Sequence, residues 1–291
     1  MVPAVNTSAA ESLLRVENVG VRFDDVVALE GISFEMGPGD TRVVLGAAGS
    51  GKTTLLKACL GLIRINSGRV YLFGRDITDL DEHSLFDIRS QVGVLFQEGG
   101  LFDSITVAEN VAYPLINRRV NALPTAEIDT KVEQALSFVE LSQTLEKFPA
   151  ELSGGMRRRV GIARAVVSEP RLVLYDSPTA GLDPITATTI MALIAKERDS
   201  RHTASLIVTQ RYQDGQLMAN FRYNRTHGQL EPVSVNGAGN QDGSNPTHTI
   251  FMVMKEGQLI FEGVQADLEA SQDPYISKFV PKHSINYGNP D

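Results

Sequence analysis

Residues 41–63 read TRVVLGAAGSGKTTLLKACLGLI and carry the strongest structural signal in the chain. TRVVLG has the apolar character of a short buried strand, and TTLLKACLGLI has the length and spacing of a helix. Between them, GAAGSGKT (residues 46–53) fits the pattern G-x-x-x-x-G-K-[ST]. In this strand–loop–helix context, the pattern predicts a phosphate-binding loop rather than a glycine-rich turn that happens to contain Lys-Thr.

The chemistry of such a loop explains its composition. Glycines let the backbone curl, so that N–H groups and the helix N-terminus face phosphate oxygens. Lys52 supplies a cation between the β- and γ-phosphates, and the Thr53 hydroxyl is a ligand for Mg²⁺. We therefore expect a bound nucleotide with Mg²⁺, held by Gly46, Ala47, Ala48, Gly49, Ser50, Gly51, Lys52, Thr53 and Thr54.

Composition limits the classes of function. The 291 residues are 42% hydrophobic and 21% charged, which is typical of a folded globular chain. The net charge of −8 argues against nucleic acid as the main partner, and the longest basic cluster, Arg157–Arg159, is interpreted as a helix surface. Cys59 is the single cysteine and is interpreted as a buried hydrophobe. With neither a secretion signal nor an apolar run of spanning length, we expect a cytoplasmic protein.

The remaining segments predict an α/β fold. The alternating pattern of residues 13–35 and the segment GRVYLFGRDI predict antiparallel strands on the N-terminal side. RLVLYD (residues 171–176) and SLIVT (residues 205–209) are buried parallel strands joined by a crossover helix. Most of residues 99–167 is helical. We divide the chain into a flexible leader (1–12), a nucleotide-binding domain (13–265, with an extra hairpin and loop at 221–249) and C-terminal helices with a tail (266–291).

Asp176 ends the strand RLVLYD, where a carboxylate can reach a magnesium ion. A lone aspartate after a strand is usually a turn residue. Its assignment as a metal ligand depends on an expectation about topology, namely that its strand runs beside the strand that precedes the phosphate loop.

Further motifs resemble one family of ATPases. GAAGSGKT, LFQ with Gln97, LSGGM (residues 152–156), the strand ending in Asp176 and GLDP with Asp183 occur in the order found in ATP-binding-cassette (ABC) ATPases. The motifs span nearly the whole chain. The resemblance implies a P-loop NTPase core with an antiparallel β portion and a helical subdomain, and ATP as the nucleotide.

Several residue roles follow from this resemblance alone. Phe23 matches the aromatic residue that stacks on adenine, and Gln97 matches the residue that reaches Mg²⁺ and the attacking water. In the family, two subunits enclose two ATP molecules, and the LSGG of one subunit faces the phosphate loop of the other. This implies a homodimer in which Ser153, Gly154 and Gly155 contact the partner's nucleotide and Asp183 signals across the interface. It also implies a transmembrane permease and a position at the inner face of the membrane.

A subfamily is also indicated. LFQEGGLFDSITVAENVAYPL, the Met156 variant of the signature and LDPIT resemble the ATPases of Mla- and Mce-type phospholipid transport systems. This resemblance implies lipid transport and an Mce-type substrate-binding protein as a further partner. It lapses over residues 221–249, where the chain carries the extra hairpin.

Two positions depart from the family pattern. Ser177 replaces the glutamate that polarises the attacking water, and Gln210 replaces the histidine that contacts the γ-phosphate. Serine is not a carboxylate base at neutral pH, and glutamine carries no charge, so we expect slow hydrolysis. Glu98 is a conceivable compensating carboxylate. One alternative stays open, an ATP-binding regulator without turnover. A soluble cassette protein of DNA repair or translation would need a long coiled-coil insertion or two cassettes in one chain, and the sequence carries neither.

Overall fold

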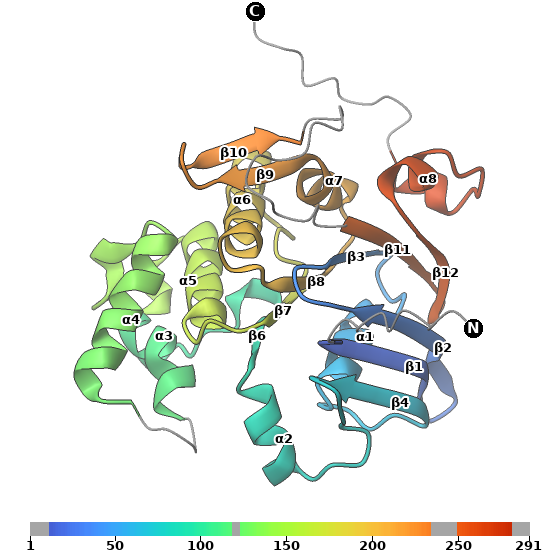
Figure 1. Ribbon diagram of the computed structural model, residues 1–291, viewed down its shortest axis with the longest axis horizontal. Helices are drawn as coiled ribbons and strands as arrows, with labels where there is room; N and C mark the ends of the chain where they lie inside the picture. Colours follow the sequence, from blue (N-terminus) through green and yellow to red (C-terminus); the bar gives the residue numbers. More distant parts are fainter. Residues whose placement is uncertain (1–11, 118–122, 234–248, 281–291) are drawn as a thin grey trace, which may run out of the picture.

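The computed structural model describes residues 12–117, 123–233 and 249–280, except for the side chain of Glu98. Its strands form a six-stranded main sheet, a four-stranded antiparallel sheet and a two-stranded hairpin, with helices around the main sheet (Figure 1). The predicted α/β class is therefore confirmed. No helix in these ranges combines the length and the apolar character that crossing a membrane requires.

The main sheet positions the predicted phosphate loop. Its strands lie in the order β12-β11-β3-β8-β7-β6, and all neighbours are parallel except the pair of β11 and β12. β8 lies between β3 and β7, so the expectation that the Asp176 strand adjoins the phosphate-loop strand is wrong. The bounds are β3 (Thr41–Leu45), β6 (Val92–Leu95), β7 (Leu172–Asp176), β8 (Ala204–Thr209), β11 (Thr249–Lys255) and β12 (Gln258–Gly263).

The antiparallel sheet follows the predicted N-terminal pattern. Its order is β2-β1-β4-β5, and Phe23 at the end of β1 pairs with Val26 at the start of β2. The sheet packs with α1 in the right half of Figure 1. The bounds are β1 (Leu14–Phe23), β2 (Val26–Met36), β4 (Ser67–Leu72) and β5 (Arg75–Asp76).

The helices fall into the predicted groups. α3, α4 and α5 form a helical region at one edge of the main sheet, and α6 is the crossover between β7 and β8 (Figure 1). Short 3-10 turns occupy Gln97–Gly99, Ser142–Thr144, Pro149–Glu151 and Ile276–Lys278. The helices are α1 (Lys52–Cys59), α2 (Glu82–Arg89), α3 (Val107–Ile116), α4 (Thr125–Phe138), α5 (Gly154–Val166), α6 (Pro184–Arg201), α7 (Tyr212–Asn220) and α8 (Gln265–Glu269).

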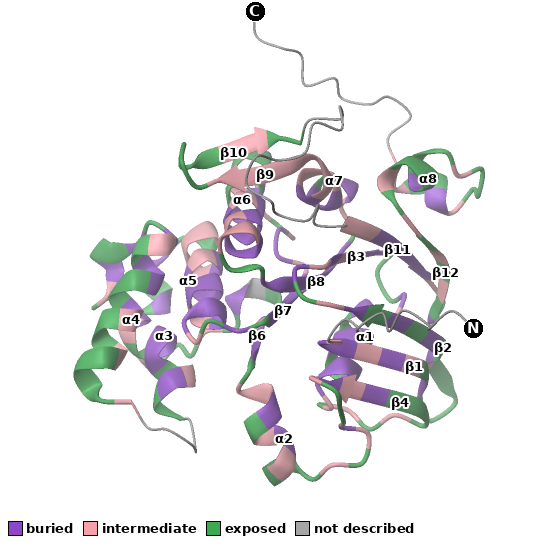
Figure 2. Ribbon diagram, viewed as in Figure 1, coloured by how far each residue is buried: buried purple, intermediate pink, exposed green. Residues whose placement is uncertain are grey.

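Alternation along the central strands divides the core between two faces. On β7, Leu172 and Leu174 pack toward α1 and the antiparallel sheet, whereas Val173 and Tyr175 pack toward the helical region. Successive side chains of a strand point to opposite faces, so a parallel strand covered on both sides is apolar throughout. Figure 2 shows the buried residues concentrated on this sheet and on the inner sides of its helices.

The extra hairpin is anchored to the core by a buried arginine. β9 (Phe221–Asn224) and β10 (Gln229–Pro232) pair antiparallel, and Gly228 with a φ of +69° lies in the turn between them. Arg198 on α6 is fully buried, and its guanidinium donates to the carbonyl oxygens of Met218 (2.6 Å) and Phe221 (2.9 Å). The loop that follows, residues 234–248, lies outside the described residues.

The C-terminal segment packs against the main sheet. Leu268 and Ile276 are buried with Val43 and Phe251 of the main sheet. Of the predicted leader and tail, residues 1–11 and 281–291 lie outside the described residues.

Candidate active site

The phosphate loop lies between β3 and α1 and depends on its glycines. Gly49 and Gly51 have φ angles of +77° and +100°, in the region that favours glycine. A Cβ on Gly51 would lie 2.6 Å from the Ala28 carbonyl oxygen, and one on Gly46 would lie 2.4 Å from the Ser50 hydroxyl. The loop is therefore packed against β2 on one side and against its own turn on the other.

Lys52 is folded into this loop. Its ammonium donates to the carbonyl oxygens of Gly46 (2.8 Å) and Ala47 (2.7 Å) and to the Ser50 hydroxyl (3.2 Å). The residue is only 7% exposed, and burial lowers its pKa, an effect that the negative charge of Asp176 partly offsets. The three acceptors are neutral oxygens, so they do not cancel the charge of the ammonium, which can attract an anionic ligand.

Thr53 and Asp176 meet although their strands do not pair. The Thr53 hydroxyl at the start of α1 donates to the Asp176 carboxylate at 3.0 Å, because α1 crosses the sheet above β8 and β7. A hydroxyl and a carboxylate oxygen at this spacing match the hard oxygen ligands that Mg²⁺ takes beside phosphate. Together with the amides at the N-terminus of α1, these residues fit a magnesium nucleotide.

The base-stacking candidate lies at the turn that joins β1 and β2. Phe23 is 49% exposed, so about half of the residue is accessible to a planar ligand. The backbone of the following strand reaches the phosphate loop at Ala28 and Gly51. The exposure of Phe23 is compatible with adenine stacking, and that role stays a prediction.

The departures from the family pattern lie at one edge of the sheet. Ser177 directly follows β7, Gln210 follows β8 and Gln97 follows β6 by two residues; since these strands are parallel, their carboxyl ends share an edge. The Ser177 hydroxyl donates to the Asp176 carboxylate at 3.3 Å. Gln97 and Gln210 are exposed. The structure thus brings the phosphate loop, Asp176 and Ser177 together.

The LSGGM motif forms the N-terminus of α5. Ser153 is the N-cap residue, and its hydroxyl accepts a hydrogen bond from the Met156 amide at 3.2 Å. Ser153 and Gly154 are exposed, and α5 packs on the face of the main sheet opposite the face that α1 covers. The motif therefore does not face the phosphate loop of its own chain.

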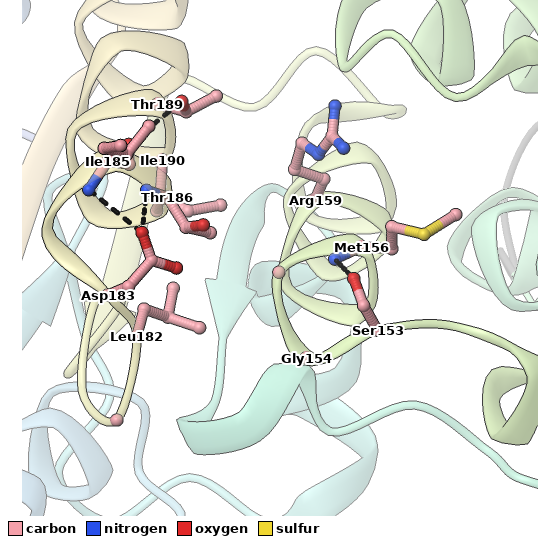
Figure 3. Close-up of a pocket in the computed structure, with 12 residues that line it drawn as sticks. Ser153, Gly154, Met156, Arg159, Leu182, Asp183, Ile185, Thr186, Thr189 and Ile190 are labelled. Atoms are coloured by element: carbon pink, nitrogen blue, oxygen red, sulfur yellow. Dashed lines mark hydrogen bonds between the residues drawn. The ribbon is translucent and has the colours of Figure 1, made fainter.

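The LSGGM motif and the first turn of α6 both line a pocket of about 450 Å³ (Figure 3). Asp183 caps α6 by accepting from the amides of Ile185 and Thr186, both at 3.0 Å. A Cβ on Gly155 would lie 2.6 Å from the Thr186 methyl group, so glycine is needed where the two helices approach. Ser153, Gly155 and Asp183 thus border one surface.

Arg158 contradicts the interpretation of the basic cluster as a helix surface. It is buried, and its guanidinium donates to the carbonyl oxygens of Ser177 (3.3 Å), Pro178 (2.7 Å) and Ala180 (2.8 Å). It lies four residues before the buried Ile162, on the inner stripe of α5. That spacing was the available signal for its burial.

Asp214 is a second residue that the sequence did not identify. Its carboxylate accepts hydrogen bonds from the hydroxyls of Thr179 and Thr209, both at 2.6 Å, and Arg211 lies 3.7 Å away. Burial raises the pKa of this carboxyl, and the two hydroxyls oppose the shift. Asp214 therefore ties the loop after Ser177 to the end of β8, directly before Gln210.

Comparison with known proteins agrees with this geometry. The family model described as ABC transporter matches residues 29–180. The chain is 33% identical over 281 residues to the methionine import ATP-binding protein MetN of Rhizobium etli, covering 96% of this chain and 71% of the relative. It is 39% identical over 184 residues to the MetN of Carboxydothermus hydrogenoformans, covering 63% of this chain and 54% of that protein.

Solved structures support the same class. The dimeric post-hydrolysis ATP-binding cassette MJ0796 bound to ADP and Pi has a TM-score of 0.71 at 26% identity, covering 86% of this chain and 98% of that chain. The cbiO1 protein of Clostridium perfringens, part of the ABC transporter complex cbiONQ, also has a TM-score of 0.71, at 27% identity, covering 90% and 92%. The fold and site define an ATPase with a phosphate-binding loop. The chain belongs to the ABC transporter family, as an ATP-binding subunit.

Proposed function

We propose that this chain binds ATP with Mg²⁺, closes with a second cassette subunit and drives a membrane permease while hydrolysing ATP slowly. One juxtaposition carries the proposal: the buried Lys52 and the Thr53–Asp176 pair, both suited to a magnesium nucleotide, lie beside Ser177. Nucleotide binding rests on groups that are all present, whereas the carboxylate for activating water is absent at position 177.

Slow turnover is expected because different groups bind the nucleotide and activate the attacking water. Bound magnesium would neutralise charge on the phosphates, and Thr53 and Asp176 are the residues placed to hold it. Loop amides and Lys52 orient the nucleotide. Water orientation by an acid–base side chain contributes about 10²–10⁴-fold, and Ser177 does not supply it at neutral pH. We expect activity reduced by a factor in that range rather than abolished.

A regulator that binds ATP without turnover is the second candidate, favoured by Ser177 and Gln210 together. Prolonged phosphate-release assays on the transporter complex distinguish the two, with Lys52→Ala as the background. Release by the wild-type complex above that background supports a slow ATPase. Release equal to the background supports the regulator.

The membrane location in this proposal comes through the permease. An exposed aromatic pair near Gln97 is suited to a protein partner: Phe102 and Tyr113 are 43% and 45% exposed, with ring centroids 4.7 Å apart. Ile116 on the same helix is 61% exposed. Tyr113→Asp should prevent copurification with the permease, whereas a change at Leu62, which is 44% exposed and follows α1, should not.

We propose phospholipid as the transported substrate, with an Mce-type protein as a further partner. The support is the resemblance of residues 92–186, including Met156, to lipid-transport ATPases. Methionine is the competing substrate, favoured by the names of the relatives. Lipid analysis of the copurified complex, and methionine stimulation of its turnover, separate the two: bound phospholipid without methionine stimulation supports the first.

A further inference from the structure

The C-terminal segment contacts the phosphate loop through one hydroxyl group. Tyr275 accepts a hydrogen bond from the Ala47 amide and donates one to the Met254 carbonyl, both at 3.1 Å. We propose that Tyr275 is a positioning residue for nucleotide binding, which makes the segment of residues 265–280 a brace for the phosphate loop. This inference rests on the proposed binding of ATP and names a residue that sets its affinity.

Tyr275 is itself held in place. The Asp273 carboxylate accepts from the amides of Tyr275 (2.7 Å) and Ile276 (3.2 Å) at the start of the short C-terminal turn. Ile276 is 3% exposed in the cluster that contains Val43, and the Phe279 ring lies 5.3 Å from the Tyr275 ring in an edge-on arrangement. The hydroxyl is therefore presented by an ordered element.

Tyr275 acts on the phosphate loop through the backbone of Ala47. The Ala47 N–H is bound by Tyr275, while the Ala47 carbonyl oxygen accepts from the Lys52 ammonium (2.7 Å) and from the Ser50 amide (3.2 Å). The Ala47 N–H lies in the same planar peptide unit as the Gly46 carbonyl, which accepts a hydrogen bond from the Lys52 ammonium at 2.8 Å. Tyr275 thus limits the orientation of the carbonyl groups that hold Lys52.

The loop is supported on the same side by the tip of the β11–β12 hairpin. The Gly257 amide donates to the Ser50 carbonyl at 3.2 Å, and the Met254 carbonyl would lie 2.7 Å from a Cβ on Gly46. Tyr275 bonds to that same Met254 carbonyl. Hairpin, C-terminal segment and phosphate loop therefore form one continuous hydrogen-bonded unit.

Tyr275→Phe removes the hydroxyl and keeps the ring, so the packing against Phe279 is retained. The Ala47 amide then loses its acceptor and the loop gains freedom that nucleotide binding must restrict. One hydrogen bond of ordinary net strength corresponds to an affinity loss of roughly 3- to 10-fold. The loss should affect ADP as well as ATP, because Tyr275 acts through the loop rather than through one phosphate.

Tyr212→Phe is the matched control. Tyr212 belongs to the same hydrophobic cluster, and its hydroxyl bonds to the Glu269 carboxylate, which ties α7 to α8. Its ring packs 5.9 Å from that of Phe251. The control therefore removes a comparable hydroxyl from the C-terminal packing without touching Ala47.

The test is calorimetric titration of the full chain with Mg-ATP and with ADP, together with thermal unfolding in the absence of nucleotide. We expect both variants to fold, Tyr275→Phe to bind roughly 3- to 10-fold more weakly, and Tyr212→Phe to bind like the wild type. Equal affinity of Tyr275→Phe and wild type would overturn the inference, as would equal weakening in both variants. A wild type that fails to bind ATP refutes the proposed function itself, a separate result.

Discussion

The ammonium group of Lys52 and the carboxylate of Asp176 show how single residues prepare this site. Each is at least nine-tenths buried, and each is held by a hydroxyl or carbonyl partner from the phosphate loop or α1. The two groups carry opposite charges and are close enough to interact electrostatically. Binding of a magnesium nucleotide should therefore depend strongly on both.

Lys52→Ala should weaken ATP binding by about 2 kcal/mol or more, or roughly 30-fold, because it removes a charge-assisted contact. Calorimetry measures this directly. Lys57→Ala, on the exposed side of the same helix, is the control and should bind ATP like the wild type. Unchanged binding in Lys52→Ala would contradict the assignment of the phosphate loop.

Cys59 gives a residue-scale test of the core. It is fully buried at the end of α1, as its apolar neighbours predicted, and burial raises the pKa of its thiol to about 12. At neutral pH the thiolate that reacts with disulfide reagents is therefore scarce. We expect no labelling of the folded protein over hours and complete labelling in denaturant; rapid labelling of the folded chain would contradict the packing of α1.

At the scale of elements, strands and helices were largely predictable because apolar runs and glycine turns mark them locally. The spatial order of strands was not, since chain order leaves open that β8 lies between β3 and β7. Asp214 was also missed. From sequence alone, a charged residue in the first turn of a helix is expected to be exposed to solvent, and its burial depends on which elements pack against it.

Asp214 joins two of these elements and should matter for stability. Asp214→Ala leaves the buried hydroxyls of Thr179 and Thr209 without their acceptor, at an expected cost of about 2 kcal/mol or more in the free energy of unfolding. Asp214→Asn retains an acceptor oxygen and should lose less. Denaturant titration compares them, and equal stability of wild type and Asp214→Ala would show that the network is not structurally important.

At the scale of the whole molecule, the phosphate loop and the LSGGM motif lie apart, so the proposed ATP site, in which both contact one nucleotide, needs a second subunit. The roles of both surfaces in binding ATP stay predictions from their motifs. The brace of Tyr275 on Ala47 was not predictable, because the two residues are 228 positions apart and only the closed fold brings them together.

Ser153→Arg should prevent ATP-dependent dimerisation while leaving ATP binding by the monomer intact, because the substitution places bulk and charge at the tip of α5. Slow hydrolysis should make the wild-type ATP dimer long-lived enough for light scattering. Ser142→Arg, at an exposed position of the helical region, is the control. A Ser153→Arg dimer equal to the wild type would contradict the proposed interface.

Steady-state ATP turnover of the permease complex tests the central claim most directly. Ser177 has a φ of +50°, which a glutamate would share at similar cost, so Ser177→Glu should fold like the wild type. We predict slow wild-type turnover, a gain of about 10²-fold or more in Ser177→Glu, and a further gain when Gln210→His is added. Brisk wild-type turnover would contradict this account: abolition by Glu98→Gln would assign the base to Glu98, and insensitivity to Glu98 would show that Ser177 does not limit the reaction.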